Sequence, residues 1–206
     1  MKVIIIQMKS LFNVMSSILF KSIFSKNNTM NLSFKKITMD DFEIADNLDK
    51  NNKSFIYGEV SHEDLSFILE KYNIENYTML DVGSGCGKMV IYLSTKFDMN
   101  IDGVEIDINR YEKSQTLLEL FDLYDKVQFF NDSFKNVYFG DYDILYCCNL
   151  VFEDKDNNLL YKKIINEFSG IFLLFEYDNS LVPYYKQKKK IKTSWNKNAD
   201  IFIFQK

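Results

Sequence analysis

The stretch that decides the fold runs from Tyr77 to Arg110 and reads YTMLDVGSGCGKMVIYLSTKFDMNIDGVEIDINR. Its first half predicts a strand over 77–82, a glycine loop and a helix over 89–97. A second apolar run over 101–106 predicts another strand, which ends in an acid. Glycines in such a loop let backbone N–H groups approach a ligand closely, and the start of the helix favours an anion. Together these features predict half of a nucleotide-binding α/β sheet.

The spacing of the glycines indicates the class of ligand. Asp81 is followed by three alternate glycines, which fits neither G-x-G-x-x-G nor G-x-x-x-x-G-K-[ST]. The pattern resembles the first motif of class I methyltransferases that use S-adenosylmethionine. That cofactor carries a carboxylate, an ammonium and a sulfonium in place of a phosphate, so an acid beside the loop is compatible with it. A tight turn without a ligand is the alternative. The cofactor-binding residues expected here are Asp81, Gly83, Ser84, Gly85 and Gly87.

The length of 206 residues predicts one domain with a full hydrophobic core. The net charge of −4 hides an asymmetry, because residues 1–39 carry six lysines and no acid. We therefore expect a basic N-terminal extension over 1–39, partly disordered or folded as an amphipathic helix, and a methyltransferase domain over 40–206. A transit peptide is an alternative for the extension that we do not favour. Polar residues interrupt its apolar runs, so no integral membrane association is expected.

The three cysteines, Cys86, Cys147 and Cys148, form no C-x-x-C pair. This pattern is typical of a reducing compartment, and we expect an intracellular protein, cytoplasmic or nuclear. His62 is the one histidine of the chain, so no metal site is expected. His62 is instead expected at the start of a helix over 61–72, where Ser61 begins an S-x-x-D capping signal.

Beyond Arg110 helical and apolar runs continue to alternate. Further helices are predicted over 112–124 and 157–168, and further strands over 126–131, 142–148, 170–175, 191–195 and 200–204. We expect an α/β, Rossmann-like class I methyltransferase fold: three layers around a mostly parallel seven-stranded sheet, with a C-terminal antiparallel hairpin. Ligands of such sheets bind at the carboxyl ends of the strands. Asp81, Glu105, Asp132 and Asn149 follow or end four of the predicted strands.

A narrower resemblance rests on six short motifs that occur in order. They are Y-G-E before the first helix, D-V-G-S-G-C-G, G-V-E, N-D-S-F, an Asn after the fourth strand, and S-W near the C-terminus. Over residues 40–206 the chain resembles the catalytic domain of the disruptor-of-telomeric-silencing family, the non-SET histone lysine methyltransferases. The resemblance implies transfer of a methyl group to a lysine amine of a histone-like or other protein.

The resemblance also implies roles for single residues. The loop with Tyr57 and Glu59 would close over the methionine end of the cofactor, with Glu59 near its ammonium. Glu105 would accept hydrogen bonds from the ribose. Asp132 and Ser133 would lie at the adenine, with Phe134 or a neighbour against the ring. Asn149 would line the channel where the lysine amine meets the methyl group. Tyr57 and Asn149 are the expected catalytic residues, and Asn149 is also expected among the cofactor-binding residues.

The chain departs from the family pattern in the acceptor region. Cys148-Asn149-Leu150 stands where the family has Asn-Asn-Phe, and Phe202 stands where the family has a channel tyrosine, seven residues after Trp195. RNA and small-molecule methyltransferases therefore remain alternatives, as does a cofactor-binding regulatory subunit without turnover. An adenine methyltransferase with N-P-P-Y is excluded, because Pro183 is the one proline.

A cluster of lysines lies near the C-terminus. It consists of Lys186, Lys188, Lys189, Lys190 and Lys192. We interpret it as a loop before the final hairpin. Such a run is commonly just a solvated surface, but it could also bind an acidic macromolecular surface and so present a protein substrate.

Overall fold

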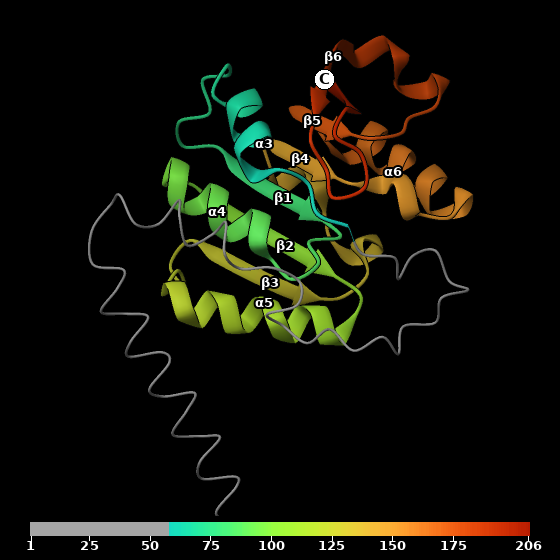
Figure 1. Cartoon of the computed structure of the whole chain (residues 1–206). Coiled ribbons are helices and arrows are strands. Elements are labelled where there is room, and N and C mark those ends of the chain that lie inside the picture. Colours follow the sequence, from blue (N-terminus) through green and yellow to red (C-terminus); the bar gives the residue numbers. More distant parts are fainter. Residues whose placement is uncertain (1–57) are drawn as a thin grey trace, which may run out of the picture. The chain divides into compact units, whose positions relative to one another are not determined.

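The structure, a computed structural model, describes residues 58–206, which form a seven-stranded sheet with helices on both faces (Figure 1). The strands are β1 (Thr78–Val82), β2 (Asn100–Glu105), β3 (Val127–Asn131), β4 (Ile144–Cys147), β5 (Ile171–Leu174), β6 (Tyr185–Ile191) and β7 (Ala199–Gln205). Their order is β3-β2-β1-β4-β5-β7-β6, parallel up to β5 and antiparallel in the last two pairings. The predicted mostly parallel sheet with a C-terminal antiparallel hairpin is confirmed.

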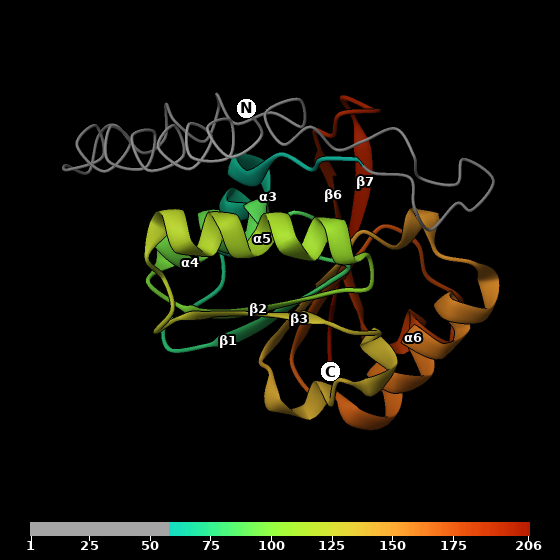
Figure 2. The same cartoon turned by 90° about the horizontal axis from the view of Figure 1, so that it is seen from below.

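The helices make the outer two of three layers. They are α3 (His62–Leu69), α4 (Lys88–Phe97), α5 (Ile108–Phe121) and α6 (Asp154–Glu167). Figure 2 shows α3, α4 and α5 on one face of the sheet and α6 on the other. The α6 face buries a large aromatic core, in which the rings of Phe172 and Phe204 stack with centroids 4.7 Å apart. Such rings provide much of the apolar surface that stabilises the sheet.

Local capping explains where the helices begin. The Ser61 hydroxyl accepts from the Asp64 N–H at 3.1 Å, which confirms the predicted cap before His62. The start predicted at residue 112 for α5 is wrong by four residues. The Asp107 carboxylate accepts from the Arg110 N–H at 3.0 Å and begins the helix at Ile108.

The C-terminal hairpin differs from the prediction. The lysine run is strand β6 rather than a loop, and only Ile191 of the expected strand over 191–195 belongs to it. Lys188 and Lys190 both pair with Asp200 of β7, at 3.4 and 2.7 Å. A lysine-rich strand is typical of a sheet edge, where charges oppose pairing with other chains.

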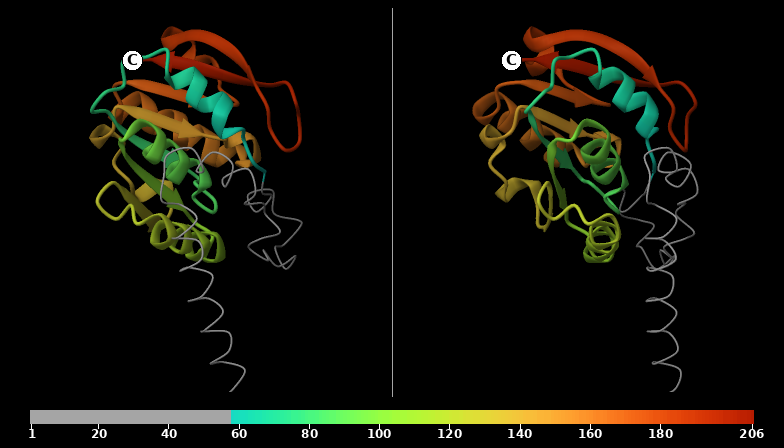
Figure 3. Two further views of the ribbon diagram at one scale, coloured as in Figure 1. Left: turned by 60° about the vertical axis from the view of Figure 1, so that its left-hand side comes forward. Right: turned by 90° about the vertical axis from the view of Figure 1, so that its left-hand side faces the viewer.

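Residues 192–195 lie outside the hairpin strands and bind a different segment. The carbonyl of Lys192 accepts from the Ser61 N–H at 2.8 Å, and the Ser194 N–H donates to the Glu59 carbonyl at 2.8 Å. Figure 3, in which α3 is cyan and the hairpin red, shows α3 beside the hairpin. These bonds bring the Glu59 loop to the carboxyl ends of the strands.

Several predictions fall outside the described residues. They are the site role of Tyr57, the boundary between 1–39 and 40–206, and the character of the N-terminal extension. Within residues 58–206 no helix is long and apolar enough to cross a membrane. The same residues hold no group of three or more metal-ligating side chains.

Candidate functional site

The glycine loop joins β1 to α4 through three left-handed glycines. Gly83, Gly85 and Gly87 have φ angles of 79°, 57° and 78°, which other residues rarely adopt. At Gly87 a Cβ atom would also lie 2.5 Å from the Phe129 ring. The Gly83 N–H donates to the Val104 carbonyl at 2.9 Å. The loop is therefore fixed against β2, beside the acid that ends that strand.

Glu105 is that acid, and its carboxylate holds the loop. Oε2 accepts from the Gly85 N–H at 2.8 Å, and Oε1 accepts from the Asp107 N–H at 2.9 Å. The residue is 5% exposed, and burial raises its pKa, an effect that the Asp107 N–H and the Arg110 charge oppose. A carboxylate has about four acceptor sites, so each oxygen can take a second hydrogen bond. Glu105 can therefore hold the loop and still bind a ligand.

Asp81 is the second buried acid and lies on β1, one residue before its end. It is 3% exposed, and burial, followed by the Glu105 charge, raises its pKa to about 8. A carboxyl with this pKa is mostly protonated at neutral pH in the cofactor-free protein. A cationic ligand beside it would favour the ionised form. Asp81 is thus suited to bind an ammonium or a sulfonium.

These groups line a cavity of about 460 Å³ beyond the carboxyl ends of β1, β2 and β4. Its volume is in the range of small-molecule and cofactor sites. Eight of the predicted site residues line it: Glu59, Asp81, Gly83, Ser84, Gly85, Glu105, Asp132 and Ser133. Gly87 does not line it and acts as the turn into α4.

Asn149, the other predicted site residue among the described ones, does not line the cavity. It is fully buried, and its side chain accepts from the N–H groups of Phe175 and Glu176, both at 3.0 Å. Its amide also donates to Asn157 Oδ1 at 2.8 Å and to the Glu176 carbonyl at 3.0 Å. It is not among the residues that line the cavity. The geometry gives Asn149 a structural role in joining the end of β4 to β5 and α6, and gives no support for its predicted channel role.

The residue that lines the cavity at this point is Cys148. Side chains alternate along a strand. Tyr146 and Cys148 line the cavity, whereas Cys147 packs in the core on the α6 face. Burial, followed by the Asp81 charge, raises the pKa of Cys148 to about 12. Its thiol therefore stays protonated at neutral pH and does not serve as a base or nucleophile.

Asp132 and Ser133 lie on the cavity wall after β3. Asp132 Oδ1 accepts from the Ser133 N–H at 2.6 Å and from Asn136 Nδ2 at 2.8 Å. Asp132 thus shapes a turn in addition to lining the cavity. The next residue, Phe134, also lines the cavity and stacks on Phe152, with ring centroids 5.6 Å apart. This side of the cavity is therefore both polar and aromatic.

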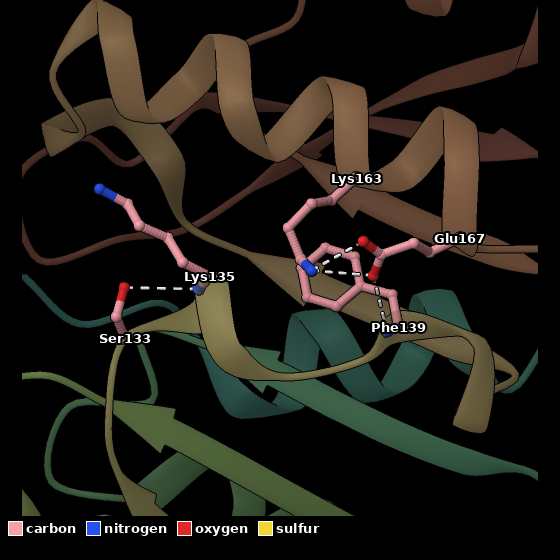
Figure 4. A network of polar contacts seen from close by, with 5 residues as sticks. All are labelled: Ser133, Lys135, Phe139, Lys163 and Glu167. Carbon is pink, nitrogen blue, oxygen red and sulfur yellow. Dashed lines mark hydrogen bonds and ion pairs between the residues drawn. The ribbon is translucent and has the colours of Figure 1, made fainter.

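The segment that carries these residues is attached to α6 (Figure 4). Lys163 donates to both oxygens of Glu167, at 2.9 and 2.8 Å, and the Phe139 N–H donates to Glu167 at 3.3 Å. Lys163 Nζ also lies 4.9 Å from the Phe139 ring centroid. Nearer the cavity, Lys135 pairs with Asp156 at 2.8 Å. These contacts fix one wall of the cavity to α6.

The polar cavity residues that the sequence predictions did not name include Lys88, Arg110 and Cys148. Lys88 directly follows the glycine loop, and its Nζ lies 2.6 Å from Glu59 Oε1. Arg110 is in the first turn of α5, three residues after Asp107. The position of Lys88 directly after the glycine loop and that of Arg110 just after the capping Asp107 could have indicated from the sequence that both lie at the cavity. Strand alternation was the signal for Cys148.

A match to a family model shows to which protein family the chain belongs. Residues 45–170 match the model of the family described as histone methylation protein DOT1. The chain belongs to the DOT1 family. No curated protein matches the sequence. The resemblance on which the DOT1 prediction rested is confirmed.

Solved structures show the fold of this DOT1 family member. An RNA methyltransferase from Salinibacter ruber, solved with S-adenosyl-L-homocysteine, has a TM-score of 0.58 and 15% identity. The match covers 69% of this chain and 90% of that chain. Magnesium protoporphyrin IX methyltransferase from Synechocystis PCC 6803, solved with bound S-adenosylmethionine, has a TM-score of 0.56 and 11% identity over 70% of this chain and 77% of that chain.

Family and fold agree on a class I methyltransferase that depends on S-adenosylmethionine. The predicted fold class and the predicted cofactor are confirmed. The neighbours differ in what they act on, one being named for RNA and the other for a porphyrin. The methyl acceptor of this DOT1 family member is therefore a separate question from its cofactor.

Proposed function

We propose that the chain transfers a methyl group from S-adenosylmethionine, bound in the cavity beside the glycine loop, to a lysine amine of a protein. The observation that carries the cofactor part is the pair of buried acids, Asp81 and Glu105, on the wall of one cavity. The acceptor part is supported by membership of the DOT1 family, whose description names histone methylation.

The cavity residues fit the parts of the cofactor. Glu105 would accept hydrogen bonds from the ribose hydroxyls, since its oxygens retain acceptor sites. Asp81 and Glu59 would lie toward the positive charges of the methionine end. Asp132, Ser133 and Phe134 would hold the adenine, where a polar edge and an aromatic face are both needed. The bound cofactor supplies an electrophilic methyl group on a positively charged sulfur.

The protein must present a neutral amine, because a protonated lysine has no lone pair with which to attack. An apolar wall serves this need by lowering the pKa of a buried amine. Leu150, Val151, Phe152 and Trp195 line the cavity and provide such a wall. Cys148 keeps its proton at neutral pH and therefore takes no part in proton transfer. Alignment of amine and methyl group in a fixed contact then contributes much of the rate acceleration.

The departures from the family pattern concern the acceptor side. Cys148 lines the cavity, whereas Phe202 packs edge-on against Tyr177, with ring centroids 4.8 Å apart.

The docking of an acidic surface on the lysine cluster stays a prediction. Asp200 offsets part of that charge, and its pKa is lowered by Lys190. A nuclear or cytoplasmic location also stays a prediction.

The acceptor is tested by incubating the protein with methyl-labelled cofactor and separate histone, total-protein and RNA fractions. We expect label in a protein fraction, located on lysine by mass spectrometry. The rate should rise with pH while the bound amine loses its proton. Label on RNA, on a small molecule or on arginine would reject the lysine proposal. Cofactor binding without any transfer would instead indicate a regulatory subunit.

A further inference from the structure

A second hollow lies on the α6 face of the sheet. It has a volume of about 510 Å³ and is more open to solvent than the cavity beside the glycine loop. Its wall comes from the first two turns of α6, from the segment directly after β5 and from Phe202 of β7. The hollow and the cavity have no lining residue in common among the described residues. The hollow is therefore a separate place at which a ligand can bind.

Aromatic side chains form half of its wall. They are Tyr161, Phe175, Tyr177 and Phe202. The rings of Tyr177 and Phe202 meet edge to face, with centroids 4.8 Å apart and planes at 63°. Two rings at this angle form adjoining walls. A cation near the face of such a ring is attracted by its quadrupole, and aromatic walls of this kind bind alkylated ammonium groups.

The charged groups of the hollow are negative. Asp154 and Glu176 line it, and none of its eight described lining residues is basic. Neither carboxylate has an ion pair or hydrogen bond with a side chain in the described part of the chain. The cation opposite Phe202 in the hairpin, Lys188, pairs instead with Asp200 at 3.4 Å. Unpaired acids beside aromatic faces favour a cationic ligand.

The floor of the hollow is fixed, and one acid acts on it. The Glu176 N–H donates to Asn149 Oδ1 and the Glu176 carbonyl accepts from Asn149 Nδ2, both at 3.0 Å. Asn149 Nδ2 also donates to the Tyr161 hydroxyl at 3.3 Å. Burial, followed by the Glu176 charge, raises the pKa of Tyr161 to about 12. The backbone of Glu176 is thus held in place, while its carboxylate is exposed beside the ring of Tyr161.

The hollow lies close to the cavity in which methyl transfer is proposed. The ring of Phe175, on the wall of the hollow, has its centroid 6.3 Å from that of Trp195, on the wall of the cavity. An extended chain advances about 3.3–3.6 Å per residue. A protein segment with one lysine in the cavity can therefore reach the hollow with a residue a few positions away.

We infer that this hollow binds a second cationic side chain of the protein substrate, a lysine or a lysine that has already been methylated. The inference rests on the proposed function, because that function supplies both the protein substrate and the methylated lysine. The aromatic rings would surround the alkyl and ammonium groups, and Glu176 and Asp154 would balance the charge. The hollow would thus select a target lysine by its neighbour.

The inference is tested with a short peptide whose one variable residue is lysine, trimethyl-lysine or the neutral carbon isostere of trimethyl-lysine. Binding to the isotope-labelled protein is followed by the shifts of its backbone N–H signals. The tighter-binding charged peptide should exceed the isostere roughly 10-fold in affinity. The largest shifts are expected at Tyr161, Glu176 and Tyr177. A preference for trimethyl-lysine would identify the reaction product as the ligand, and a preference for lysine would identify an unmodified neighbour.

Glu176→Gln keeps the backbone bonds to Asn149 and removes only the charge. It should weaken binding of the charged peptides roughly 3–5-fold and leave the isostere unchanged. Phe202→Leu removes one ring face and should also reduce the preference for charge. Glu112→Gln is the matched control, because Glu112 is an exposed acid on α5, on the opposite face of the sheet from α6 (Figure 2). It should bind all three peptides as the wild type does.

Equal affinities for the three peptides would overturn the inference, as would Glu176→Gln binding them like the control. Shifts confined to Cys148 and Trp195 would place the peptide in the cavity and would also overturn it. The proposed function fails on a different result, which is wild-type protein that transfers no methyl group to lysine in the labelled-fraction experiment, whether or not charged peptides bind in the hollow.

Discussion

Replacing Asn149 by alanine is expected to lower the free energy of unfolding by about 3–5 kcal/mol. The variant leaves the buried N–H group of Phe175 and the part-buried N–H group of Glu176 without their acceptor. Each unsatisfied buried donor costs about 1–3 kcal/mol. It also deprives the Asn157 side chain and the Glu176 carbonyl of a donor. Chemical denaturation of the cofactor-free protein measures the loss.

Asn158→Ala is the control, because Asn158 is exposed on α6 next to the buried Asn157. We expect its effect to stay within about 0.5 kcal/mol, as for most surface substitutions. If Asn149→Ala is no more destabilising than this control, the hydrogen-bond network is wrong. A stable Asn149→Ala protein that binds cofactor but has lost methyl transfer would instead restore the channel role predicted from the sequence.

Asp81→Asn is expected to stabilise the cofactor-free protein at alkaline pH and to weaken cofactor binding. The pKa of Asp81 is about 8, raised from the ordinary value of 3.8. The folded protein therefore holds this proton more tightly than the unfolded chain, and wild-type stability is lost as pH rises from about 4 through 8. Asparagine has no charge to bury. The stability advantage of the variant over the wild type should therefore grow by several kcal/mol, about 2–5, between pH 5 and pH 9.

The measurement is denaturation of both proteins across pH 5 to 9 without cofactor, followed by cofactor titration at pH 8. A stability difference that does not change with pH would show that Asp81 is ionised throughout. Unchanged cofactor affinity would remove its carboxylate from the binding site. The combination of a more stable protein and a weaker site is the specific result, because a merely damaged fold would lose both.

The central part of the fold was predictable because its signals are local. Alternate glycines fix the turn after β1, and the acid after the second apolar run marks the end of β2. Helix ends were less accurate, since the start of α5 depends on the Asp107 cap. Strand β6 was missed because its lysines lack an apolar alternation. Asp200, the acid that pairs with two of them, comes from the next strand.

Most of the residues predicted for the cofactor lie together on the wall of one cavity, whereas Asn149, predicted for the acceptor channel, does not line it. Asp81 and Glu105 lie on the cavity wall because strand ends of a parallel sheet share one edge. At the end of β4 a shift of one residue changes the face, and the structure turns Cys148 to the cavity and Asn149 to α6. The Lys88–Glu59 pair joins segments 29 residues apart, a contact that spacing alone does not reveal.

The most direct test of the account is calorimetric titration of S-adenosylmethionine into the wild-type protein and into Glu105→Ala. The account predicts a saturable single site in the wild type and an affinity lower by about 1.5–3 kcal/mol in the variant, the cost of losing hydrogen bonds to a charged acceptor. Glu112→Ala, an exposed acid on α5, should bind as the wild type does. Unchanged affinity in a folded Glu105→Ala protein would contradict the assignment of this cavity as the cofactor site.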